Sequence, residues 1–285
     1  MKKFLLKFLF FFIGFLCSFF ILFKSIDYFF NNEFNNQKAL FIWGDSQAYQ
    51  DFDLDILSNG LDRKVFSAAH HGAGVYDFLV FCNEVPENGN ILVSISKLML
   101  LRSKQRDYNR SGLSFEALKI IHNQNYSKEE VLSIFKNNLK PSRNINSNIE
   151  LYPIKDSINA IGLVKKVESF YKMKPHYLKD KKAIFIEGIK ILQSKKCNIN
   201  FIDLPLHPEF KKMEEKYSTL QELEDYKLKI VSLFNNYGID SILVSSQKNI
   251  FNDATHLNSK GAKYLSVELA RVLKFNEHTV LYIAH

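Results

Sequence analysis

Cysteine is scarce in this chain of 285 residues: the three are Cys17, Cys82 and Cys197. Three cysteines exclude a disulfide-rich scaffold, and Cys17 lies inside an apolar N-terminal run, so only Cys82 and Cys197 could pair. The apolar surroundings of these two favour buried free thiols. No CxxC or HExxH motif occurs, so the sequence indicates neither a metal site nor a cofactor.

Glycine and proline are also few, at 11 and 6 residues, whereas phenylalanine is abundant at 26. The hydrophobic share of 46% and the charged share of 24% are ordinary for a globular protein that buries a sizeable core. The net charge of +8 permits attraction to an anionic lipid or glycan. Because Lys and Arg alternate with Asp and Glu instead of clustering with aromatic residues, the pattern does not indicate a nucleic-acid partner.

An apolar stretch close to the start of the chain predicts a membrane anchor. Residues 4–23 are interrupted only by Lys7, and about 20 residues are needed for a helix to cross a bilayer. Lys2 and Lys3 precede the stretch, which predicts that this end stays in the cytoplasm and the remainder is extracytoplasmic. We therefore expect an N-terminal stub and transmembrane anchor over residues 1–30, followed by a polar tether over residues 31–38.

Two other kinds of N-terminal segment fit the sequence less well. A cleavable signal peptide requires small residues at its cleavage site, and residues 19–30 offer none in that pattern. A lipoprotein signal requires a small residue before its cysteine, but Leu16 precedes Cys17. The sequence therefore favours an uncleaved anchor.

The remaining residues, 39–285, alternate between short apolar runs and longer helical stretches. The runs at 39–43, 64–67, 91–96, 200–204 and 241–244 are expected strands, and helices are expected from about residue 76, at 181–194 and at 219–237. This alternation predicts a parallel sheet covered by helices on both faces, with ligands bound at the carboxyl edge of the strands. Residues 103–178 do not follow the pattern and predict a mostly helical insertion, suited to a lid or a partner-binding surface.

The triplet Gly44-Asp45-Ser46 directly follows the first predicted strand. Glycine allows a tight turn there, so that a serine hydroxyl can stand exposed at the edge of the sheet and its own N–H can bind an oxyanion. The same three residue types are also common in ordinary turns. Taken alone, the triplet leaves both interpretations open.

Asp253 and His256 lie just ahead of the last predicted helix. Residues three apart share a face of a helical turn, so the carboxylate and the imidazole can meet. A nucleophilic serine needs such a base, and the base needs a partner that fixes its tautomer. The alternative is that Asp253 or Thr255 only caps the helix.

Together, the two motifs resemble the SGNH/GDSL hydrolase family, in which GDS follows the first strand and DxxH precedes the last helix. The stretch at residues 253–262, DATHLNSKGA, is similar to the last block of that family, and the resemblance extends over about residues 39–273. It implies a flavodoxin-like three-layer α/β/α domain with a parallel sheet. It also implies that Ser46 is the nucleophile, His256 the general base, Asp253 its orienting partner and Asp45 a turn residue.

The second block of the family contributes a glycine N–H to the oxyanion hole. In the loop at residues 67–74, Gly72 is the expected donor and Gly74 its rival, although both glycines could serve only to turn the loop. His70 and His71 in this loop lack acidic or thiol partners at ligand spacing, which favours a structural or surface role.

The third block departs from the family pattern. An Asn in a G-x-N context usually follows the third strand, but here the strand leads into Ser96 and Lys97. We expect the Ser96 hydroxyl to donate in place of the Asn; without a substitute, the loss of one oxyanion donor costs about 10²–10³ in rate. His207, between two prolines after the fourth strand, either contacts substrate or belongs to a rigid loop.

The resemblance implies acyl transfer through Ser46, to water in an esterase or to a sugar hydroxyl in an O-acyltransferase. Similar membrane-anchored proteins add or remove acetyl groups on polysaccharides of the cell envelope. A single anchor helix cannot carry an acyl group across the membrane, so a multi-spanning O-acyltransferase is an expected partner. The alternatives are a non-catalytic binding or assembly protein with the same fold, and a lipase or esterase at the membrane surface.

Overall fold

The computed structural model describes residues 7–8, 10–15, 17–18, 38–101, 151–153, 168, 178–208, 210, 223, 225, 230, 239–244, 250–275 and 281–283. The chain divides into two compact units, Met1–Gln37 and Lys38–His285. The described residues of the first unit are helical, and the phenylalanines among them are widely exposed, with Phe11 at 73%. None of the described helices combines the length and the apolar character needed to span a membrane. The predicted anchor at residues 4–23 lies partly outside the described residues.

The second unit is built on a sheet of six parallel strands in the order β2-β1-β3-β4-β5-β6. The strands are β1 (Leu40–Trp43), β2 (Val65–Ser67), β3 (Asn90–Ser94), β4 (Asn198–Asp203), β5 (Ile239–Val244) and β6 (Leu281–Ile283). The first five correspond to the predicted apolar runs. The predicted parallel α/β fold is therefore confirmed, whereas β6 was not predicted.

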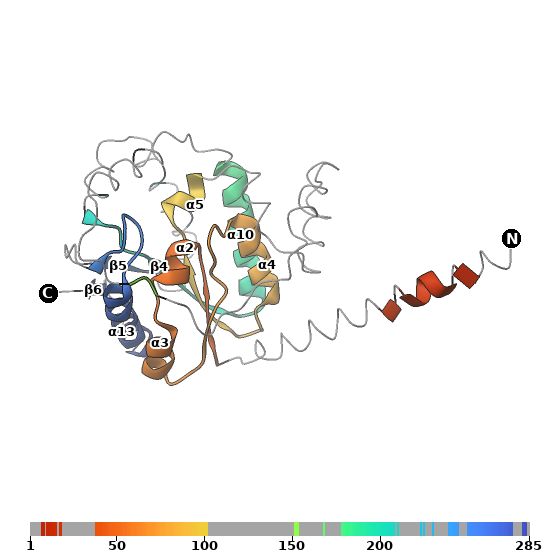
Figure 1. Ribbon diagram of the computed structural model, residues 1–285, viewed down its shortest axis with the longest axis horizontal. Helices are drawn as coiled ribbons and strands as arrows, with labels where there is room; N and C mark the ends of the chain where they lie inside the picture. Colours follow the sequence, from red (N-terminus) through yellow and green to blue (C-terminus); the bar gives the residue numbers. More distant parts are fainter. Residues whose placement is uncertain are drawn as a thin grey trace. The chain divides into compact units, whose positions relative to one another are not determined.

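Two pairs of helices cover the sheet. Helix α3 (Leu54–Leu61) packs against α13 (Ser259–Phe275), and α4 (Val75–Glu84) packs against α10 (Leu178–Ser194), as Figure 1 shows. Successive residues of a strand point to opposite faces, and β1 contacts one pair through its even positions and the other through its odd positions. The pairs therefore lie on opposite faces of the sheet, as expected for a parallel sheet.

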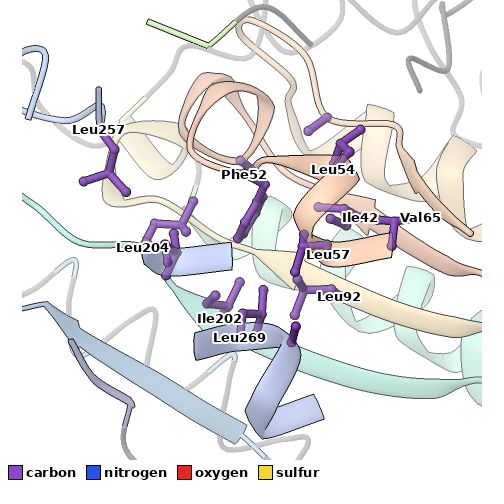
Figure 2. Close-up of a cluster of buried hydrophobic side chains, with 14 of the residues drawn as sticks. Ile42, Phe52, Leu54, Leu57, Val65, Leu92, Ile202, Leu204, Leu257 and Leu269 are labelled. Atoms are coloured by element: carbon purple, nitrogen blue, oxygen red, sulfur yellow. The ribbon is translucent and has the colours of Figure 1, made fainter. Parts of the chain in front are cut away.

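The core on the α3 and α13 side is mostly aliphatic, with Phe52 among the side chains that Figure 2 shows. Leu40 and Ile42 of β1 belong to one buried cluster with Leu57 of α3 and Leu269 of α13. Leu257, from the loop before α13, belongs to the same cluster and is fully buried. The core thus fixes the position of the loop that carries Asp253 and His256.

The core on the α4 and α10 side is aromatic. Trp43 at the end of β1 contacts Phe78 of α4, with ring centroids 4.7 Å apart, and Phe185 of α10, with centroids 6.3 Å apart. Cys82 and Cys197 are buried free thiols, as predicted, and burial raises the pKa of the Cys197 thiol. Trp43 precedes Gly44, so this packing fixes the strand end from which the site begins.

Two predicted segments are only partly described. The insertion at residues 103–178 falls outside the described residues except for 151–153, 168 and 178, the last of which begins α10. The predicted helix at 219–237 is represented by three helical residues, 223, 225 and 230. Two short helices were not predicted, α2 (Ser46–Gln50) directly after β1 and α5 (Lys97–Leu101) after β3. Both begin at the carboxyl edge of the sheet.

Candidate active site

Ser46 is the first residue of α2 and is partly exposed at the carboxyl end of β1. Asp45 caps the helix, because its Oδ1 accepts a hydrogen bond from the N–H of Gln47 at 3.1 Å. Asp45 itself is almost fully buried. The expected turn role of Asp45 therefore takes the form of a cap on the helix that begins at Ser46.

Gly44 is required because other atoms approach it closely. A Cβ atom at this position would lie 2.5 Å from Cβ of Ala48 and 3.2 Å from both Cβ and the carbonyl oxygen of Ser94. Glycine thus lets α2 turn back across the end of β3 immediately after β1.

Replacing Gly44 with alanine is therefore expected to destabilise the protein by about 1–3 kcal/mol, a typical cost of overpacking. At about 2–4 °C per kcal/mol, thermal unfolding should show a clear drop in Tm. Adding Ala48→Gly removes the closer of the two clashes, so the double variant should be less destabilised than the sum of the single variants. A Gly44→Ala protein that unfolds at the wild-type temperature would contradict this explanation.

Asp253 organises the loop that presents His256. Its Oδ1 accepts hydrogen bonds from the N–H groups of Thr255 at 2.8 Å and His256 at 3.0 Å. The loop is closed by a bridge between Phe251 and Leu257 and by a bond from the Asn252 N–H to the carbonyl oxygen of His256. The carboxylate therefore shapes the turn as well as contacting the imidazole, and the helix α13 begins only after it, at Ser259.

The structure brings Ser46, His256 and Asp253 into one hydrogen-bonded chain. Nε2 of His256 lies 3.0 Å from Oγ of Ser46, and Nδ1 lies 3.0 and 3.1 Å from the two carboxylate oxygens of Asp253. An imidazole with its proton on Nδ1 satisfies both contacts, since it donates to Asp253 and accepts from the Ser46 hydroxyl. This is the geometry that a base needs in order to take the proton of a serine.

Two bonds that were not predicted join α2 to the histidine loop. The side-chain amide of Gln47 donates to the carbonyl oxygen of Thr255 at 2.6 Å, and Oδ1 of Asp51 accepts from the N–H of Leu257 at 2.9 Å. Positions 47 and 51 are one helical turn apart, so they face the same way. In the sequence, the signal for these contacts was the pair of polar residues one helical turn apart, although the sequence does not show what they bind.

The backbone geometry distinguishes the two candidate glycines of the second loop. The N–H of Gly74 donates to Oδ2 of Asp77 at 2.8 Å, so it is not available to an oxyanion. Gly72 adopts a left-handed φ of 77°, and within the described residues its N–H makes no hydrogen bond. The loop adjoins the serine turn, because the His70 N–H bonds to the carbonyl oxygen of Gly44. Of the two glycines, Gly72 is thus the better candidate for the oxyanion donor. The N–H of Ser46 is a further candidate, because the first residue of α2 has no helical partner for its N–H.

The expectation that Ser96 acts as an oxyanion donor needs correction. Its hydroxyl donates to Oδ2 of Asp45 at 2.5 Å and accepts from the N–H of Met99 at 3.1 Å. A hydroxyl has one proton to donate, and here it is used in the hydrogen bond to Asp45. Ser96 is buried and holds the helix-capping residue instead.

The other histidines near this edge have packing or surface positions, in line with the structural alternative. Nε2 of His70 lies 3.5 Å from Oδ1 of the buried Asp77, and the exposed His71 meets the ring of Tyr49 edge-on. His207 is buried and packs edge-on against Phe251.

Tyr152, from the predicted insertion, is a neighbour of the site that the sequence did not reveal. Its ring centroid lies 5.5 Å from that of His256 in an edge-on arrangement, and its carbonyl oxygen accepts from the N–H of Ser259 at 2.7 Å. Partial burial and the negative charge of Asp253 raise the pKa of Tyr152. A half-buried aromatic ring therefore borders the imidazole.

Neither a scan against protein-family models nor a search of curated proteins gives a match for this chain. The functional conclusion therefore depends on the residues and on their geometry.

Proposed function

We propose that residues 39–285 form an SGNH hydrolase-like domain that transfers acyl groups through Ser46. The observation that carries the proposal is the bonded chain from Ser46 to His256 to Asp253. Three features support it further: the strand order 2-1-3-4-5, which is that of flavodoxin-like folds, the GDS triplet after the first strand, and the DxxH motif before α13.

The geometry supports a two-step reaction. His256 takes the hydroxyl proton of Ser46 as Oγ attacks the carbonyl carbon of an ester, and the N–H groups of Ser46 and Gly72 stabilise the oxyanion. The intermediate collapses with cleavage of the bond to the leaving alcohol, which receives the proton from His256. An acceptor hydroxyl then gives its proton to His256 and attacks the acyl carbon. The bond from that carbon to Oγ of Ser46 breaks, and His256 returns the proton to Oγ, which restores the serine. With water as acceptor the enzyme is an esterase, and with a sugar hydroxyl it is an O-acyltransferase.

The proposed substrate is a polysaccharide of the cell envelope, which the enzyme would acetylate as a transferase or deacetylate as an esterase. Residues 4–23 have the length and composition of an anchor that would hold the domain on the extracytoplasmic side of the membrane, with the N-terminus inside. The net charge of +8 suits an anionic envelope surface. In the transferase case, a multi-spanning O-acyltransferase is the proposed source of the acyl group.

The proposal is tested in cells by comparing the deletion, the wild-type gene and Ser46→Ala. The measurement is the acetate released by mild alkali from purified envelope polysaccharide. Ser46→Ala is expected to behave as the deletion does, with less bound acetate than wild type if the protein is a transferase and more if it is an esterase. A Ser46→Ala protein present at the wild-type level that restores the wild-type acetate content would count against an acyl-serine mechanism.

A second candidate function is non-catalytic binding or assembly in the same pathway of glycan modification. The observation that favours it is the hydrogen bond from Ser96 to Asp45. Because of this bond, Ser96 does not supply the third oxyanion donor. This function predicts that Ser46→Ala and His256→Ala each restore the wild-type acetate content to the deletion strain. The enzymatic proposal predicts that neither does.

A further inference from the structure

A second carboxyl group is buried against the loop that carries His256. Asp51 follows α2 directly and has no exposed surface. Its Oδ1 accepts from the N–H of Leu257, the residue after His256, at 2.9 Å. Its Oδ2 is buried and has no hydrogen-bond partner within the described residues. A half-satisfied buried carboxyl group is destabilising, and an amide or an apolar side chain would avoid a charge at this position.

The ionisation of Asp51 is coupled to its charged neighbours. Burial raises the pKa of Asp51 to about 8, an imidazolium at His256 lowers it, and the carboxylates of Asp253 and Asp45 raise it. Tyr152 also interacts with the group, and its own pKa is raised above the ordinary tyrosine range. Asp51 is therefore neutral at pH 7 and becomes charged within the range in which enzymes are commonly assayed.

We infer that Asp51 is a positioning residue for the proposed reaction: through Leu257 it fixes the backbone of His256, and its carboxyl group stabilises the imidazolium that forms when Ser46 attacks. The inference rests on the proposed function. It explains why an acidic side chain occupies a site where it is half-satisfied, since the negative charge that Asp51 acquires as the pH rises through about 8 makes His256 a stronger base.

Two substitutions separate the two parts of this role. Asp51→Asn keeps an oxygen that can accept from the N–H of Leu257 and resembles the neutral acid, whereas Asp51→Ala removes the acceptor. Asp55→Asn, at an exposed position on α3, is the control for the loss of one negative charge away from the site.

The first measurement is the rate at which a small fluorophosphonate labels Ser46 in the full chain, from pH 5.5 to 9.5. The wild-type rate is expected to rise as His256 loses its proton and to rise again near pH 8 as Asp51 ionises. Asp51→Asn should lack the second rise and match the wild type at pH 6, and Asp55→Asn should keep both rises. Asp51→Ala should label about 10- to 100-fold more slowly at pH 6, because the imidazole is displaced.

The second measurement is Tm as a function of pH, which requires no activity. Because the folded pKa of Asp51 lies above its unfolded value, its contribution to stability is present at low pH and is lost as the pH rises through about 8. Asp51→Asn has no such loss, so its Tm should exceed that of the wild type by about 5 °C or more at pH 9, and the difference should shrink towards pH 4.

The outcomes distinguish this inference from the function on which it rests. A wild-type protein that is not labelled at any pH overturns the proposed function, whatever the Tm values show. A labelled wild type whose pH profile is reproduced by Asp51→Asn overturns the role of Asp51 alone. A Tm difference that does not depend on pH also overturns it.

Discussion

Replacing His256 with alanine is expected to slow the labelling of Ser46 by a fluorophosphonate about 10²–10⁴-fold at pH 7.5, the usual contribution of a positioned general base. The reason is the 3.0 Å contact between Nε2 and the serine Oγ: without the imidazole, the hydroxyl has no group to take its proton. The measurement is the second-order rate constant of labelling in the full-length protein, with folding checked by thermal unfolding.

The structure offers a matched control and a rescue for this variant. His71→Ala removes an exposed histidine of the second loop, so it should label at the wild-type rate. Imidazole added to the buffer should restore part of the rate to His256→Ala and none to Ser46→Ala. An unchanged rate in His256→Ala would mean that the contact between the two side chains has no catalytic role.

Replacing Asp253 with asparagine is expected to slow labelling by up to about 10⁴-fold while leaving the fold intact. The amide oxygen can still accept from the N–H groups of Thr255 and His256, so the turn is kept. The amide –NH₂, in the place of the oxygen 3.1 Å from Nδ1, can only donate a hydrogen bond to Nδ1, which favours the tautomer with its proton on Nε2. That nitrogen can then no longer accept the proton of Ser46.

Asp253→Ala separates the two functions of this carboxylate. It loses the acceptor of the turn as well as the partner of the imidazole, so both the labelling rate and the Tm should fall. For Asp253→Asn only the rate should fall. If Asp253→Asn labels like the wild type, the carboxylate shapes the loop and does not act on the imidazole.

The sequence predicts the framework of the domain because strand and helix lengths differ clearly along it. Five apolar runs of four to six residues became β1 to β5, since each is bounded by polar or glycine-containing segments. The strand β6 (Leu281–Ile283) was not predicted. The candidate catalytic residues were predicted from the GDS and DxxH motifs together, because their places after the first strand and before the last helix resemble the SGNH/GDSL pattern.

The contacts that complete the site were not predictable, because they join positions far apart in the chain. The partners of Gln47 and Asp51 lie 208 and 206 residues away, and no local pattern reports such a pairing. Tyr152 belongs to a stretch without clear periodicity. The choice between Gly72 and Gly74 depended on the hydrogen bond from the Gly74 N–H to Asp77. The prediction for Ser96 was wrong because only the structure shows that its hydroxyl donates its hydrogen bond to Asp45.

The central claim is that one serine in this chain is activated, and mass spectrometry of the full-length protein tests it most directly. The detergent-solubilised protein is treated with a fluorophosphonate at pH 7.5, and the intact mass and the proteolytic peptides are then analysed. We predict one adduct per chain, on Ser46, and none in folded His256→Ala under the same conditions. A folded wild-type protein that carries no adduct, or carries it on another residue, would contradict the account.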